Sequence, residues 1–190
     1  GAVATENRVT APQGREPVRG RYVRIERPQE PKKHPMPLAL VEVQVYSGQR
    51  NAALQGKASQ SSVEGPSGPQ HAIDNDTSMI KGNGNSVAQT KRSDETPWWE
   101  VDLGSVAPLD RIVLWGRSDG GYANQAQSYR VSVLGADRKS VWERYVETIR
   151  SSIEEIPLTE TTDVYLWRCD RNRKPPAPNA RLSTYEARHQ

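Results

Sequence analysis

The chain has 190 residues, enough for one domain of ordinary size or two small ones. Hydrophobic residues make up 34% and charged residues 26%, which is polar for a globular protein but well above the level at which a chain fails to fold. The net charge is +3, and no apolar run approaches the roughly 18 residues that a membrane helix needs.

Positive charge is concentrated near the two ends of the chain. Residues 1–36 hold eight basic and four acidic residues, residues 168–190 hold six and two, and the middle, 37–167, holds twelve and seventeen. A nucleic-acid-binding protein usually carries its basic patch on the folded domain, so this distribution argues against nucleic acid as the partner. It fits basic arms that dock on an acidic protein surface, and it also fits two solvated tails.

Cysteine usage and the first residues of the chain bear on its covalent chemistry and on its processing. The single cysteine, Cys169, excludes an internal disulfide framework and an all-cysteine metal site. The chain starts at Gly1 and shows no signal peptide, so we expect a processed or trimmed product.

The first third of the chain contains two predicted strands. Residues 1–20 have no period and are expected to form an irregular arm. Residues 22–26 and 40–46 alternate, with Val41, Val43 and Val45 on one face of the second strand. Between them, 27–37 carries four prolines and is predicted to be a non-helical connection.

The rest of the chain is predicted to be mostly β. Residues 47–96 are polar and rich in Gly, Ser and Asn, and we expect short strands and ordered loops there. Strand-like segments follow at 98–103, 111–115, 129–134 and 141–145, with two weaker ones at 152–156 and 163–167 and an alternative short helix over 143–155. Strands at this spacing predict a β-sandwich or barrel.

Five sequence blocks in a fixed order carry a resemblance to a known family. They are residues 51–62 (NAALQGKASQSS), 71–76 (HAIDND), 97–104 (PWWEVDLG), 112–119 (IVLWGRSD) and 129–134 (YRVSVL). Together they resemble fucolectin-type domains, which belong to the discoidin or coagulation factor 5/8 C-type group of galactose-binding-like domains. The resemblance implies an all-β, jelly-roll-like sandwich that binds a sugar in the loops at one end.

Two further blocks stand in an unusual place. Residues 21–25 (RYVRI) and 40–46 (LVEVQVY) resemble the closing strands of the family, yet here they precede the opening block. A circular permutation with the original ends joined near residues 47–50 explains this order, because sandwich termini are often close in space. We therefore expect an arm at 1–20, a permuted sandwich at 21–145 and an extension with a docking arm at 146–190.

The same resemblance implies a structural calcium site. Asp74 and Asp76 lie two residues apart in a loop, so both carboxylates can face one point, and calcium prefers six to eight oxygen ligands. By resemblance the remaining ligands are the carbonyl groups of His71 and Val41, the Glu42 carboxylate and Ser86. The alternative is an Asx-turn in which Asp74 and Asp76 cap their own loop.

A sugar site is the other expectation, and its motif is incomplete. Fucolectins use a His, an Arg-x-Asp motif and a further basic residue. Here the His position is Gln89, the motif is Arg117-Ser118-Asp119, and the last basic position falls near Asn124. Two of the three key groups are thus neutral, which argues against fucose as the ligand, and Arg117 has a purely structural alternative role.

Two functional hypotheses remain from the sequence. The first is a non-catalytic carbohydrate-binding module with calcium on an exported, extracytoplasmic protein; no hydrolase, metalloprotease or phosphate-loop motif supports an enzyme. The second is an assembly subunit of a larger complex or filament that docks a protein partner through 1–20 and 146–190.

The adjacent Trp98 and Trp99 face opposite sides of their strand, so one is expected in the core.

Overall fold

The computed structural model describes residues 16–28, 36–78, 87–117, 128–146 and 153–158, all within one compact unit, residues 1–160. The elements are β1 (Val18–Glu26), β2 (Ala39–Leu40), β3 (Glu42–Ser47), β4 (Arg50–Asn51), the 3-10 helix η1 (Ala52–Gln55), β5 (Lys57–Gln60), the 3-10 helix η2 (Pro69–Ala72), β6 (Ala88–Gln89), β7 (Trp98–Leu109), β8 (Arg111–Trp115), β9 (Tyr129–Leu134), β10 (Ser140–Val146) and β11 (Ile153–Pro157). The predicted all-β class is confirmed.

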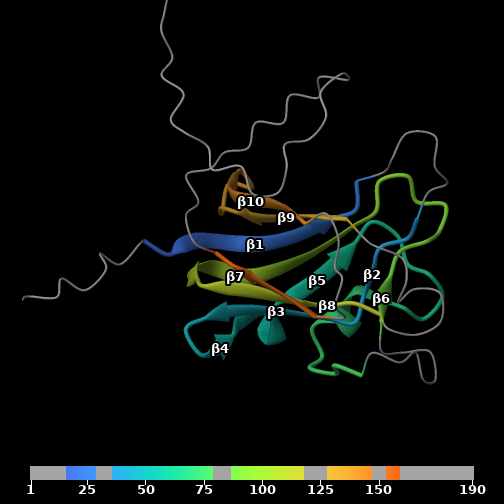
Figure 1. The fold of residues 1–190 in the computed structure, drawn as a ribbon, viewed down its shortest axis with the longest axis horizontal. Helices are drawn as coiled ribbons and strands as arrows, with labels where there is room; N and C mark the ends of the chain where they lie inside the picture. Colours follow the sequence, from blue (N-terminus) through green and yellow to red (C-terminus); the bar gives the residue numbers. More distant parts are fainter. Residues whose placement is uncertain (1–15, 29–35, 79–86, 118–127, 147–152, 159–190) are drawn as a thin grey trace, which may run out of the picture. The chain divides into compact units, whose positions relative to one another are not determined.

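The strands form three antiparallel sheets (Figure 1). The largest has the order β10-β9-β1-β7-β5, the second β11-β8-β3-β4, and β2 pairs with β6 in a short third sheet. β1 and β3, which come early in the chain, therefore lie inside the two larger sheets between strands that come later.

The core is built from alternate residues of the two larger sheets. Fully buried side chains of β1, β7 and β9 pack with those of β3, β8 and β11 in one apolar cluster, which includes Ile25, Val45, Trp99, Leu114, Val131 and Ile156. Alternation places each apolar set on one face of its strand. Val43 and Val45 are completely buried in this cluster, as the alternation predicted, whereas Val41 is buried in a second, smaller cluster with Ala39 and Val87.

A large bulge interrupts the pairing of β1 with β7. Gly20 is opposite Ala107 and Tyr22 is opposite Asp102, so four residues of β7 face Arg21 alone. Gly104 in this bulge has a φ of +84°, which favours glycine, and its N–H donates to the Asp102 carboxylate. Arg21 donates to both oxygens of the same carboxylate at 2.8 Å and holds its pKa below the usual range.

One corner of the sandwich joins the hairpin after β3 to the ends of the described chain. The hairpin pairs Ser47 with Arg50 around a two-residue turn, in which Gly48 has a φ of +60°. The backbone N–H of Asp110 donates to the Tyr46 carbonyl, and the backbone carbonyl of Asp110 accepts from the N–H of Leu158. Because Val18 pairs with Leu109, the first and last described strands begin and end at this corner.

Most predicted strands are confirmed, with three differences. Residues 40–46 are divided by a bend at Val41 into β2 and β3. The alternative helix over 143–155 is wrong for its described part, because 143–146 pairs with β9 and 153–155 pairs with β8. Strand pairing also continues to Val18 and Pro157, beyond the predicted limits 21–145.

The remaining expectations for the two arms lie outside the described residues. This applies to residues 1–15 and 159–190, which include the weak strand at 163–167 and Cys169. Docking of a partner through these segments stays a prediction.

Candidate functional site

The described calcium and sugar residues expected from the sequence lie in or next to loops at one end of the sandwich, which we call the loop end. Its first feature is a buried carboxylate. Glu42 begins β3 and pairs with Trp115 of β8, and it alternates with the core residues Val43 and Val45 of the same strand. Its side chain is completely buried, and neither carboxyl oxygen has a hydrogen-bond partner among the described residues. Burial raises the pKa of Glu42 to about 8, and the negative charges of Asp74 and Asp76 act in the same direction.

Backbone N–H groups near Glu42 offset little of the free-energy cost of burying its carboxylate. Those of Asn75 and Asp74 approach the carboxylate and act to lower its pKa, yet neither makes a hydrogen bond of good geometry with it. An unpartnered carboxylate in a protein interior carries a large desolvation penalty. The site therefore has the chemistry of a cation site, in which a bound positive charge would offset that penalty.

The loop beside Glu42 contains the two predicted aspartates. Asp74 accepts the N–H of Asp76 at 2.9 Å, and Asp76 accepts the N–H of Ser78 at 2.9 Å and also its hydroxyl. These are the contacts of the Asx-turn alternative. Asn75 between them has a φ of +66°, and the second Asp74 oxygen lies 3.4 Å from Nδ1 of His71. Asp76 thus uses one carboxylate oxygen within its own loop.

The predicted ligand set is only partly brought together. Among the described residues no group of three or more His, Cys, Asp and Glu side chains is placed to hold a metal ion. Glu42 and Asp74 interact electrostatically across the loop, whereas Ser86 lies outside the described residues. The other expected ligands, the carbonyls of Val41 and His71, belong to the backbone. Calcium therefore remains an expectation.

The predicted sugar residues include one close pair. Nη1 of Arg117 donates to Oε1 of Gln89 at 3.0 Å, and both side chains are more than 90% buried. Gln89 lies on β6 and Arg117 follows β8, so two segments 28 residues apart meet here. Asp119 and Asn124 lie outside the described residues. The pair is thus engaged with itself, which fits the structural alternative for Arg117 and leaves the sugar assignment untested.

The sequence did not reveal the residue that holds Gln89 in place. Gln60, at the end of β5, donates its amide to three carbonyls, those of Ser62, Ser67 and Gln89, at 2.6 to 3.2 Å. The Gln89 carbonyl also accepts the N–H of Glu64, and its own N–H donates to Ser67. One glutamine amide therefore connects three loop segments. Its only sequence signal is its place in the block at 51–62.

A second unforeseen feature is a carboxylate that links two loops. Asp94 accepts the hydroxyls of Ser61 and Ser62 at 2.5 and 2.6 Å and the N–H of Thr96 at 3.1 Å. Partial burial acts to raise the pKa of Asp94, but these hydrogen bonds outweigh it and lower the pKa. Ser62 also accepts the N–H of Lys91. The loops at 61–67 and 90–97 are therefore fixed to one another.

We expect Asp94→Ala to destabilise the protein by about 1–3 kcal/mol, because three donors lose a partly buried acceptor. Urea denaturation followed by tryptophan fluorescence measures the change. Glu95→Ala is the matched control, since Glu95 is the exposed neighbour and surface substitutions usually cost no more than about 0.5 kcal/mol. Equal unfolding midpoints for the two variants would contradict this role of Asp94.

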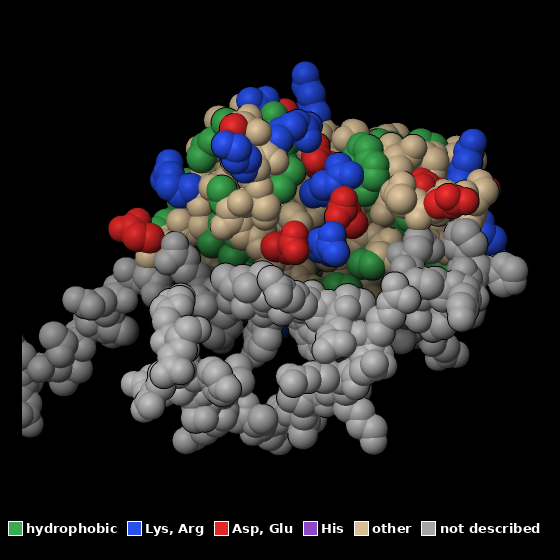
Figure 2. Space-filling model, turned by 90° about the horizontal axis from the view of Figure 1, so that it is seen from above, with side chains coloured by type: hydrophobic (Ala, Val, Ile, Leu, Met, Phe, Trp, Pro, Cys, Tyr) green, Lys and Arg blue, Asp and Glu red, His purple; other side chains and the backbone are tan. Residues whose placement is uncertain are grey.

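The outer face of the five-stranded sheet carries aromatic rings covered by arginines. Arg24 lies over Trp98 at 4.2 Å and Arg138 over Tyr22 at 4.2 Å, and both guanidinium groups donate to Glu100. Figure 2 shows basic and acidic side chains interspersed on the face that it presents. The ring of Trp98, the sequence neighbour of the core residue Trp99, is therefore covered by Arg24 rather than free to stack on a ligand.

The comparisons with known proteins identify one family. The model of the F5/8 type C domain matches residues 55–172, more than half of the chain. No curated protein and no solved structure matches the chain. The match begins after β1, β2 and β3, although β1 and β3 occupy interior positions in the two larger sheets. In the described part of the chain, no helix has the length and apolar character that crossing a bilayer requires.

Proposed function

The chain belongs to the F5/8 type C domain family, and from this premise we propose that it is a carbohydrate-binding module whose loop end is held by a structural calcium ion. Domains of this family are non-catalytic binding modules for carbohydrates or lipids, and they occur in extracellular proteins. The chain is accordingly a binding module and not an enzyme. An extracytoplasmic location for this chain is part of the proposal.

The observation that carries the calcium part is the Glu42 carboxylate. It is completely buried, lacks a hydrogen-bond partner among the described residues, and faces the negative charge of Asp74. Glu42 and Asp74 would supply the carboxylate oxygens, and backbone carbonyls of the adjoining segments would complete the set that Ca²⁺ prefers. When bound, the ion supplies positive charge that offsets the mutual repulsion of the two carboxylates.

Polar groups fixed at the same end support saccharide over lipid as the ligand. The two loops joined by Asp94 present mainly polar and charged side chains, and their one exposed large apolar residue is Val63. Carbohydrate recognition depends on preorganised hydrogen-bonding groups, whereas insertion into a bilayer depends on apolar surface.

A glycan array and vesicle sedimentation together test the proposal. We expect the chain, with calcium present, to bind at least one neutral saccharide and not to sediment with phosphatidylserine–phosphatidylcholine vesicles. Sedimentation with vesicles and no glycan binding would overturn it in favour of a lipid-binding module.

We also propose that the domain is a circular permutant joined at residues 47–50. The strands before the family match complete both larger sheets, and the hairpin lies at the corner where the described chain begins and ends. A chain that starts at Asn51 and carries residues 16–47 after Leu158 through a short linker should fold with a similar circular dichroism spectrum. Failure of this rearranged chain to fold, when the original order folds under the same conditions, would contradict the proposal.

A further inference from the structure

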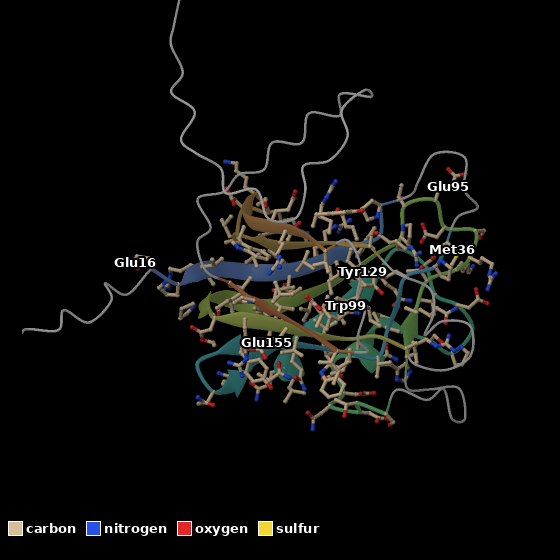
Figure 3. All side chains as sticks on the ribbon, in the orientation of Figure 1. Glu16, Met36, Glu95, Trp99, Tyr129 and Glu155 are labelled. Atoms are coloured by element: carbon tan, nitrogen blue, oxygen red, sulfur yellow. The ribbon has the colours of Figure 1, made fainter. Side chains whose placement is uncertain are left out.

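A second polar site lies at the loop end, on the side of the five-stranded sheet. A pocket of about 250 Å³ is formed where β1 ends and where β7 and β9 begin, and it is lined by Glu26, Arg27, Pro28, Glu95, Thr96, Pro97 and Arg130. Figure 3 shows Glu95 at the end of the sandwich opposite Glu16. Glu95, Thr96 and Pro97 belong to the loop that follows β6 and its Gln89, so the pocket is at the same end as Gln89 but is built on different strands.

The walls of this pocket are fixed by hydrogen bonds. The N–H of Arg27 donates to the Pro97 carbonyl at 3.0 Å, which joins the segment after β1 to the segment before β7. Thr96 is held by Asp94, and Nη1 of Arg27 donates to the Pro37 carbonyl at 3.1 Å. A site whose walls are already ordered loses little conformational entropy when a ligand binds.

Three charged side chains of the pocket, those of Glu26, Glu95 and Arg130, retain hydrogen-bonding capacity. Arg130 lies 3.7 Å from Glu26 and 3.8 Å from Glu143, distances too long for hydrogen bonds. Glu26 uses Oε1 to accept from Arg24, and Glu95 is exposed at the rim. A ligand in the pocket thus meets both guanidinium donors and carboxylate acceptors.

We propose that this pocket is a saccharide subsite that takes one neutral sugar ring; the inference rests on the proposed carbohydrate function. Two carboxylates and two guanidinium groups give the lining no net formal charge, so neither an anion nor a cation is favoured. A polyhydroxylated ring both donates and accepts hydrogen bonds, as this lining does, and the prolines offer apolar surface to its C–H groups. The volume is below the roughly 300–1,000 Å³ typical of pockets for drug-sized ligands, which suits one ring.

This subsite is separate from the Gln89–Arg117 pair. Those two side chains are buried and bonded to each other, whereas Glu95 and Arg130 reach solvent. Saccharide binding by this chain would then depend on residues that the family motif does not mark.

Titration of the ¹⁵N-labelled protein with methyl glycosides of galactose, fucose, mannose and N-acetylglucosamine tests the subsite. We expect at least one glycoside to shift signals of residues 95–97 and 130, and Glu95→Gln and Arg130→Gln each to weaken its binding about tenfold or more. Glu155→Gln, an exposed carboxylate on β11, is the control and should bind like the unmodified chain.

Two other outcomes overturn the inference in different ways. Binding that persists unchanged in Glu95→Gln and Arg130→Gln would remove the subsite and leave the carbohydrate function in place. Absence of binding to every glycoside and to the glycan array would remove both. Thermal unfolding of each variant verifies that it is folded, so that loss of binding is assigned to the pocket.

Discussion

Removal of calcium at pH 8 is expected to lower the melting temperature of the protein by roughly 5–10 °C. Binding of a ligand at about a hundred times its dissociation constant stabilises the native state by about 2.7 kcal/mol, and each kcal/mol corresponds to about 2–4 °C for a domain of this size. Differential scanning fluorimetry in 1 mM calcium and in excess EDTA measures the shift. Magnesium in place of calcium should restore little of it, because Mg²⁺ requires a smaller and more regular oxygen shell.

The pH dependence of the calcium-free protein follows from the same carboxylate. The pKa of Glu42 is raised from 4.5 to about 8 in the folded state, so the folded state holds a proton that the unfolded state releases. This proton contributes at most about 5 kcal/mol to the free energy of unfolding. The contribution is fully present below pH 4.5 and is lost as the pH rises through 8. Calcium binding displaces the proton, so the stabilisation by calcium should grow from pH 5 to pH 8.

Glu42→Gln separates this explanation from a general loss of packing. The amide has nearly the same shape and cannot ionise, so in EDTA at pH 8 the variant should melt at a higher temperature than the unmodified chain and should not respond to calcium. Glu155→Gln, on the exposed part of the same sheet, should keep the full calcium response. An identical response to EDTA in the unmodified chain and in Glu42→Gln would exclude Glu42 as a ligand.

The sandwich could be predicted from the sequence because its signals are local. Strict alternation at 40–46 marks the buried face of β3, and the blocks at 97–104 and 129–134 each coincide with a strand. The bend at Val41 was not predictable; at this residue the backbone N–H donates to the Trp115 carbonyl across the sheet. Local alternation carries no information about such a long-range contact.

The candidate site could be predicted less completely. Its Asp74 and Glu42 follow from the family resemblance, but the burial of Glu42 depends on how the 71–78 loop covers the end of β3. Gln60 and Asp94 were missed because Gln and Asp in polar loops are common, and their contacts join segments about 30 residues apart. Likewise, the pocket lining is assembled from the ends of three strands that no single motif contains.

Replacement of Trp99 by alanine is expected to have the largest effect of any single substitution considered, about 3–5 kcal/mol. Trp99 is 1% exposed, packs in the core between the two larger sheets, and donates its indole N–H to the Pro69 carbonyl at 2.9 Å. Its loss leaves a cavity and a carbonyl without its donor. Because Pro69 begins η2, which contains His71 and leads into the loop with Asp74, this segment should also loosen.

Trp98→Ala is the matched comparison, since the two tryptophans are adjacent and face opposite sides of β7. Trp98 is partly exposed and contacts Arg24 through its ring, so its removal should cost only about 1 kcal/mol. Urea unfolding followed by far-ultraviolet circular dichroism measures both losses without relying on tryptophan emission. Calcium-dependent stabilisation should persist in Trp98→Ala and weaken in Trp99→Ala, because only Trp99 is bonded to the segment that leads into the calcium loop. Equal losses of stability in the two variants would contradict the division of β7 into a core face and a solvent face.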